Sequence, residues 1–313
     1  MITIKNVRNL LGQLETVNLY SPNDQVIDAK ECWMLMPALI DVGAINAVDW
    51  KKDAEQALRG GITTIFDLYQ APNGLKKEWV TARKQKIREE LSSLKMPLQT
   101  PMYLEVTPDT VEELGKMENM MAAIKVAKKH LSNGPFVDRV FQLAAQDDCI
   151  LILTVDEMLI EQTREMLELA EKYSTQTILL NVSTQEEVEL LRQAQRSELL
   201  VDGTVSALAL LDRDFLWGAL KENVVSCVTS SEKYQDRSLI LSVLLHGYYT
   251  SQILFEEIIE YSRIKPERLL QLGMNGDAVI VDLELPFPIS KDRILRGGAR
   301  FTVLGGGTYE VNQ

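Results

Sequence analysis

The chain has 313 residues, of which 46 % are hydrophobic and 25 % are charged, a balance typical of a globular protein with a substantial core. Its net charge of -12 argues against a nucleic acid or an anionic membrane as partner, because both require basic surface. No apolar run reaches the ~18 residues of a membrane span and the N-terminus shows no signal-peptide core, so we expect no membrane association.

Both ends of the chain are predicted to be rich in short strands. Alternating apolar and polar residues predict strands within 2–7, 16–29, 277–285 and 300–311. We expect 1–35 and 276–313 to meet in one small β-sandwich-like domain. The glycines of LGGGTYE lie between two strands rather than before a helix, which favours a hairpin turn over a nucleotide-binding loop.

The middle of the chain alternates apolar strands with amphipathic helices. Strands are predicted within 62–68, 149–155, 177–182, 198–206 and 223–231, and helices within 51–61, 135–148, 161–173 and 183–196. Ser183 and Glu186 have the spacing of a capping box at the start of the last helix. Repeated βα units of this kind predict an α/β fold, a (β/α)8 TIM-type barrel over 36–275.

Cysteine and histidine are both scarce. Cys32, Cys149 and Cys227 are far apart and form neither a disulfide framework nor a zinc motif, so we expect a cytoplasmic protein. The only histidines are His130, in a basic run expected at the surface, and His246, in an apolar stretch expected to be packed. Any site built on three or four imidazoles is therefore excluded.

The sequence resembles the dihydroorotase branch of the cyclic amidohydrolases over nearly its whole length. The matching segments are LMPALIDVGAI, WKKDAEQALRGGITTIFDL, TILLNVSTQEEVELLRQAQ, DRDFLWGALKENVVSCVTSSEK and RIKPERLLQL. The resemblance implies a barrel with a small β-domain from both termini. It also implies hydrolysis of a cyclic amide by water activated between two divalent metals, usually zinc.

The family's metal ligands are absent from the matching positions. The resemblance puts Gly43 and Ile45 where the family has its H-x-H pair, and Thr154 and Asn181 where it has two further histidines. Ile45 offers no lone pair to a metal. We therefore expect no metal cofactor and no catalytic residue.

Three further positions complete this comparison. The resemblance puts Ser231 at the family's acid–base aspartate and Gln70 near its substrate-binding asparagine. It puts Lys125, in MAAIKVA, at the lysine that is carboxylated to bridge the metals. Because that modification is stabilised by the metals, we expect Lys125 to be unmodified.

The remaining polar residues have structural explanations. Lys125 precedes a basic run, which favours a solvated or snorkelling side chain. For Asp41 a supporting hydrogen-bonding role is at least as well indicated as a catalytic one. Asp156 and Glu157 precede a helix, where carboxylates favour its positive end.

Three functional hypotheses remain open at this point. The first is a catalytically inactive dihydroorotase homologue, self-associating, that is a structural or regulatory partner of aspartate transcarbamoylase in pyrimidine biosynthesis, as the resemblance implies. The second is an active cyclic amidohydrolase with a rebuilt site using Lys125, Asp41, Asp67 or Asp156. The third is an inert barrel with another partner, or with a small ligand held at its mouth.

Overall fold

The computed structural model describes residues 1–22, 24–45, 49–70, 74–96, 98–117, 120–155, 158–231, 236–273, 276–283, 301–304 and 309–312. Eight parallel strands form a nearly closed barrel, which confirms the predicted fold class. They are β5 (Leu39–Ile45), β6 (Ile62–Gln70), β7 (Met102–Val106), β8 (Ala123–Val126), β9 (Leu151–Thr154), β10 (Thr177–Leu180), β11 (Val201–Ser206) and β12 (Cys227–Thr229).

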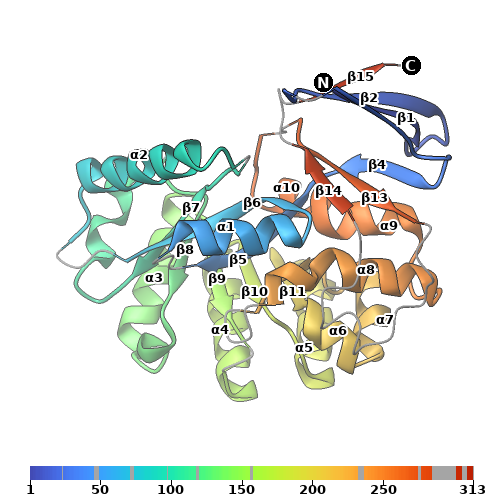
Figure 1. Cartoon of the computed structure of the whole chain (residues 1–313). Coiled ribbons are helices and arrows are strands. Elements are labelled where there is room, and N and C mark those ends of the chain that lie inside the picture. Colours follow the sequence, from blue (N-terminus) through green and yellow to red (C-terminus); the bar gives the residue numbers. More distant parts are fainter. Residues whose placement is uncertain are drawn as a thin grey trace.

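Helices surround this ring of strands, as Figure 1 shows. They are α1 (Trp50–Arg59), α2 (Lys77–Ser93), α3 (Gly134–Gln146), α4 (Ile160–Tyr173), α5 (Gln185–Arg196), α6 (Ala207–Asp212), α7 (Phe215–Lys221), α8 (Ile240–Tyr249), α9 (Phe255–Ile259) and α10 (Lys265–Leu269). The described helical elements also include four short turns: η1 (Val111–Met117), η2 (Lys128–His130), η3 (Asp236–Leu239) and the π-helical η4 (Glu260–Ile264). Within the described residues no helix is long and apolar enough to cross a membrane.

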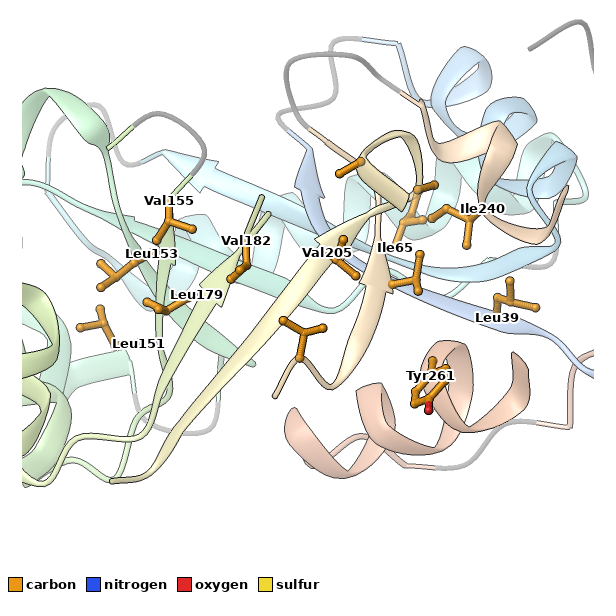
Figure 2. Close-up of a cluster of buried hydrophobic side chains, with 14 of the residues drawn as sticks. Leu39, Ile65, Leu151, Leu153, Val155, Leu179, Val182, Val205, Ile240 and Tyr261 are labelled. Atoms are coloured by element: carbon orange, nitrogen blue, oxygen red, sulfur yellow. The ribbon is translucent and has the colours of Figure 1, made fainter. Parts of the chain in front are cut away.

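Apolar side chains on the two faces of each barrel strand pack in different places. Leu151, Leu153 and Leu179 belong to the larger core, which lies between strands and helices (Figure 2). Residues of opposite parity fill the barrel itself, where the rings of Phe66 and Tyr103 stack with centroids 4.4 Å apart. The barrel interior is therefore a packed core, as in other barrels of this type.

The strands from both chain ends form one further sheet, which confirms the small β-domain expected from the termini. These strands are β1 (Ile2–Arg8), β2 (Leu14–Leu19), β3 (Gln25–Asp28), β4 (Trp33–Pro37), β13 (Ala278–Asp282), β14 (Phe301–Leu304) and β15 (Tyr309–Asn312). Their order is β14-β13-β4-β1-β2-β15, with β3 also paired to β1. In Figure 1 the two termini lie close together beside this sheet.

Two local predictions are wrong. Within the described residues the hairpin expected across LGGGTYE is not found: β14 pairs with β13 and β15 pairs with β2, at opposite ends of the sheet order. The glycines 305–307 themselves lie outside the described residues. The capping box of α5 is Thr184 with Glu187, one residue later than predicted, because the Thr184 hydroxyl accepts from Glu187 N at 3.1 Å.

Candidate functional site

The positions that match the family's ligands lie toward the carboxyl ends of barrel strands, where barrel enzymes have their active sites. Gly43 and Ile45 are in β5, Lys125 is in β8, and Thr154 ends β9. Asn181 directly follows β10, and Ser231 follows β12 by two residues. Asp156 and Glu157 lie outside the described residues.

Gly43 lies in an interruption of the β5–β6 register. Asp41 pairs with Ile65 and Ala44 pairs with Phe66, so β5 advances three residues while β6 advances one. A Cβ atom at position 43 would lie 2.7 Å from Ser230 Oγ and 3.0 Å from Thr229 Oγ1. Because non-bonded heavy atoms pack best at about 3.5–4.0 Å, any side chain at this position would push against β12.

Asp41 fixes the neighbouring end of β12. Its Oδ1 accepts hydrogen bonds from Gly43 N at 3.0 Å, Thr229 Oγ1 at 2.8 Å and Ser230 N at 2.9 Å. Its Oδ2 accepts from Ser230 Oγ at 2.6 Å and from Arg237 Nε at 2.5 Å. A carboxylate offers about four lone-pair positions, so these five donors leave none for a metal or a substrate proton. The hydrogen-bonding role considered for Asp41 is confirmed.

Arg237, in η3, neutralises the Asp41 carboxylate. Both side chains are almost fully buried, at 5 % and 0 % exposure. Burial alone would raise the pKa of Asp41, but the Arg237 guanidinium and the hydrogen bonds from Ser230 and Thr229 hold it below its ordinary value. Asp41 is therefore ionised in the folded protein at neutral pH.

Asp67 faces the helix layer and not the barrel mouth. Arg83 of α2 donates to its two carboxylate oxygens, from Nε at 3.0 Å and from NH2 at 2.8 Å. The Asp67 side chain is fully buried, whereas Arg83 keeps 24 % exposure. A bidentate ion pair of this kind holds α2 to β6 and commits Asp67 to a structural contact.

Lys125 is buried on the inner face of β8, so the solvated side chain predicted for it is wrong. The residue is 4 % exposed and aligns in register with Glu105 of β7. Glu105 is 8 % exposed, and both its carboxylate oxygens lie 3.1 Å from the Gln70 amide nitrogen. Gln70, Glu105 and Lys125 thus make a polar arc across three adjacent strands, β6, β7 and β8.

The next two strands end in buried polar atoms. Thr154 Oγ1 and Asn181 Oδ1 make no hydrogen bond within the described part of the chain. Asn181 adopts the left-handed conformation, with φ 65°, which asparagine tolerates better than most residues. Buried atoms of this kind mark positions that ordinarily bind a water molecule or a ligand. Ser231 is also buried, at 2 % exposure.

A cleft of about 990 Å³ opens beside the polar arc. Gln70 and Glu105 line it together with Thr107, Lys129 and His130. His130 is half-buried and meets the Phe136 ring edge-on, with centroids 5.6 Å apart.

The second histidine is far in sequence from the residues that line this cleft. His246 lies on α8, partly exposed, between the buried residues Leu245 and Gly247. The packed histidine predicted from the apolar stretch agrees with this position.

The residues at the barrel mouth do not fit two divalent metals. Within the described residues no group of three or more His, Cys, Asp or Glu side chains is placed to hold a metal ion. Position 43 has no room for an imidazole, and the Asp41 carboxylate already accepts five hydrogen bonds. The absence of a metal cofactor nevertheless stays a prediction.

Sequence reasoning missed the residues that surround Asp41. Thr229, Ser230 and Arg237 are close to Asp41 in space but 188 to 196 residues away in the chain. No local pattern signals such a contact. Glu105 was detectable, because it alternates with Tyr103 in MYLEV and so shares the inner face of β7.

Comparisons with known proteins give structural likeness without sequence likeness. No family model matches the chain, and no curated protein matches it either. A D-hydantoinase structure superposes with a TM-score of 0.71 at 15 % identity, covering 98 % of this chain and 94 % of that one. A dihydropyrimidinase from Brevibacillus agri gives 0.68 at 15 % identity, with the same coverage of both chains.

A third structure is described as an inactive domain. The inactive dihydroorotase-like domain of the Chaetomium thermophilum CAD-like multifunctional protein has a TM-score of 0.64 at 14 % identity, covering 83 % of this chain and 87 % of that one. The chain therefore shares its fold with these hydantoinase, dihydropyrimidinase and dihydroorotase-like structures. At identities this low, the likeness establishes the fold and leaves the activity to be argued from the site.

Proposed function

We propose that the chain is a catalytically inactive dihydroorotase-like protein. The observation that carries this proposal is the lack of space at Gly43. The Thr229 and Ser230 hydroxyls occupy the place that a side chain at this position would need. Hydrolysis of a cyclic amide requires a polarised carbonyl and an activated water molecule. Asp41 and Asp67, the described carboxylates named for a rebuilt site, are both engaged in ion pairs.

We further propose that the protein acts as a structural or regulatory partner of aspartate transcarbamoylase. The sequence resemblance to dihydroorotases supports this, since members of that family associate with this enzyme. The similar inactive domain belongs, by its description, to a CAD-like multifunctional protein, so an inactive copy of the fold occurs beside other units. The net charge of -12 suits a basic surface on the partner.

The decisive experiment mixes the purified chain with the aspartate transcarbamoylase of the same organism. Size-exclusion chromatography with light scattering should show a complex heavier than either protein, and self-association should appear in the chain alone. Failure to co-elute, together with a deletion strain whose pyrimidine synthesis and complex size are unchanged, would show that the partnership is wrong.

The inactive state has its own test. Dihydroorotate and hydantoin should not be turned over by the purified protein, either as isolated or after incubation with Zn²⁺ or Mn²⁺. Turnover together with near-stoichiometric bound metal would instead establish the rebuilt-site enzyme.

The cleft favours a second candidate function within the same inactive fold. Glu105, Lys129 and His130 bring opposite charges and an imidazole ring to one cavity of about 990 Å³, which is the size of a metabolite site. A small polar ligand held there would make the barrel a sensor for its partner. Thermal-shift screening with charged metabolites tests this idea, and Glu105→Gln should abolish any shift found.

A further inference from the structure

The barrel has a seam between its first and last strands. The strand order runs from β5 round to β12, but within the described residues these two strands share no backbone ladder. Instead, the Asp41 carboxylate of β5 accepts from Ser230 N, the amide just after β12, at 2.9 Å. The same oxygen also accepts from Gly43 N of β5. A side chain therefore joins main-chain amides from both sides of the seam.

Arg237 also bridges the seam, from a position outside the sheet. Besides its bond to Asp41, its NH2 lies 3.2 Å from Ser230 Oγ and 3.5 Å from Gly43 O. One guanidinium thus contacts the carboxylate and groups from both strands. Its planar fork of donors is suited to several fixed acceptors at once, which a lysine ammonium does not reproduce.

The burial of both partners makes each depend on the other. Asp41 is fully buried and Arg237 is 4 % exposed, so water cannot compensate either charge if its partner is lost. The surface ion pair of Arg139 with Glu112 differs in this respect, since those side chains are 37 % and 64 % exposed.

We propose that Asp41, Ser230 and the Gly43 carbonyl form a cation cradle that the chain fills with its own Arg237 guanidinium, and that this internal cation holds the barrel closed. The dihydroorotase resemblance implies two metal cations at the barrel mouth. The residues present there do not fit metal ions. An arginine side chain provides a fixed positive charge beside the strand that the resemblance matches to the metal ligands. The inference is independent of any partnership with a transcarbamoylase.

The test removes the guanidinium and returns it as a free ion. Arg237→Ala should lower the melting temperature, and millimolar guanidinium chloride should restore most of that loss in a saturable way. Sodium chloride at the same ionic strength should not. Arg139→Ala is the matched control, because it removes an arginine from an exposed pair and leaves no buried carboxylate. Equal effects of guanidinium on the two variants would overturn the proposal.

Hydrogen exchange shows whether the seam itself opens. In Arg237→Ala, peptides covering 39–45 and 227–231 should exchange faster than in the wild type, and guanidinium should slow them again. Arg83→Ala disrupts a different buried pair, with Asp67, and should instead affect peptides from β6 and α2. Unchanged exchange at 39–45 in Arg237→Ala would contradict the proposed closure.

If Arg237→Ala does not fold, Arg237→Lys keeps the test open. Lysine retains the charge but lacks the fork, so the variant should fold with faster exchange at 39–45 and 227–231. Free guanidinium should have no effect on it, because the cradle is occupied. Wild-type exchange in Arg237→Lys would show that the fork contributes nothing to closure.

Discussion

Gly43 allows β5 and β12 to approach each other closely. The Thr229 and Ser230 hydroxyls occupy the space that a side chain at position 43 would need. Those same hydroxyls donate to Asp41, so the close approach and the hydrogen bonds depend on each other. The absence of a Cβ is thus a packing requirement at this position.

Gly43→Ala should therefore be destabilising, even though alanine is the smallest replacement. We expect a loss of about 1–3 kcal/mol in the free energy of unfolding, the usual range for overpacking. Chemical denaturation measures it. Gly218→Ala in α7 is the control, since its Cβ would meet nothing within 4 Å, and should be stabilising by up to about 1 kcal/mol. A Gly43→Ala variant as stable as the control would show that β12 moves aside freely.

Single residues at the barrel mouth were only partly predictable. A hydrogen-bonding role was considered for Asp41 beside a catalytic one, because the sequence match at this position also reflects the geometry of the strand. Its main partner, Arg237, was not predicted, because it lies 196 residues away in the chain. Lys125 was misjudged because the basic run after it suggested solvent, whereas its alternation with Ala123 places it on the inner face of β8.

At the scale of elements, the helices and strands that the sequence analysis named are present, but β7, β8, α2 and the helices after α5 were not named, and some helix ends were misplaced. The helix before β6 ends as expected, with Gly60 as its C-cap. The α5 box was misplaced by one residue because Ser183, Thr184, Glu186 and Glu187 offer two overlapping pairs. The hairpin was expected because β14 and β15 are neighbours in the sequence. The actual partner of β15 is β2, and pairing between strands so far apart leaves no local sequence pattern.

The seam should make the stability of the protein depend on pH in the acidic range. The pKa of Asp41 is lower in the folded protein than its ordinary value, which is about 3.9 in an unfolded chain. A lowered pKa contributes stability that is fully present above the unfolded value and is lost as the pH falls through the folded one. We expect the difference in unfolding free energy between wild type and Asp41→Asn to be constant from about pH 7 to 5 and to shrink only below about pH 4.

The measurement needs one correction for a neighbouring group. Asp53 of α1 lies near Arg237, and burial raises the pKa of Asp53 despite that attraction. Its effect on the pH dependence of stability is therefore opposite to that of Asp41. Both proteins are therefore compared in an Asp53→Asn background by denaturation at a series of pH values. A difference that stays constant down to pH 3, or that disappears near pH 6, would contradict the role given to Asp41.

At the scale of the whole molecule, the two chain ends complete one sheet. β14 pairs with β13 along Ala278–Val281, and β15 pairs with β2 along Thr16–Leu19. Both ends of the sheet order are therefore C-terminal strands. The barrel was predictable from the repeated succession of strands and helices along the chain, and this sheet from the short strands at both chain ends.

Removal of residues 301–313 should expose two unpaired strand edges, on β13 and on β2. Exposed edges pair readily with other chains, so the truncated protein should melt at a lower temperature and form soluble aggregates. Size-exclusion chromatography across a concentration series checks this expectation. A truncated chain with the melting temperature and elution volume of the full-length protein would show that β14 and β15 are dispensable.

The interrupted register of β5 has a consequence for redesign. Residues two apart share a face only where a strand keeps its regular pleat, and position 43 lies where that pleat is broken. A side chain introduced at position 43 would thus not take the direction that the pleat of a regular strand would give it. Building a chelating pair into this part of β5 would therefore require a change of its main chain as well as of its side chains.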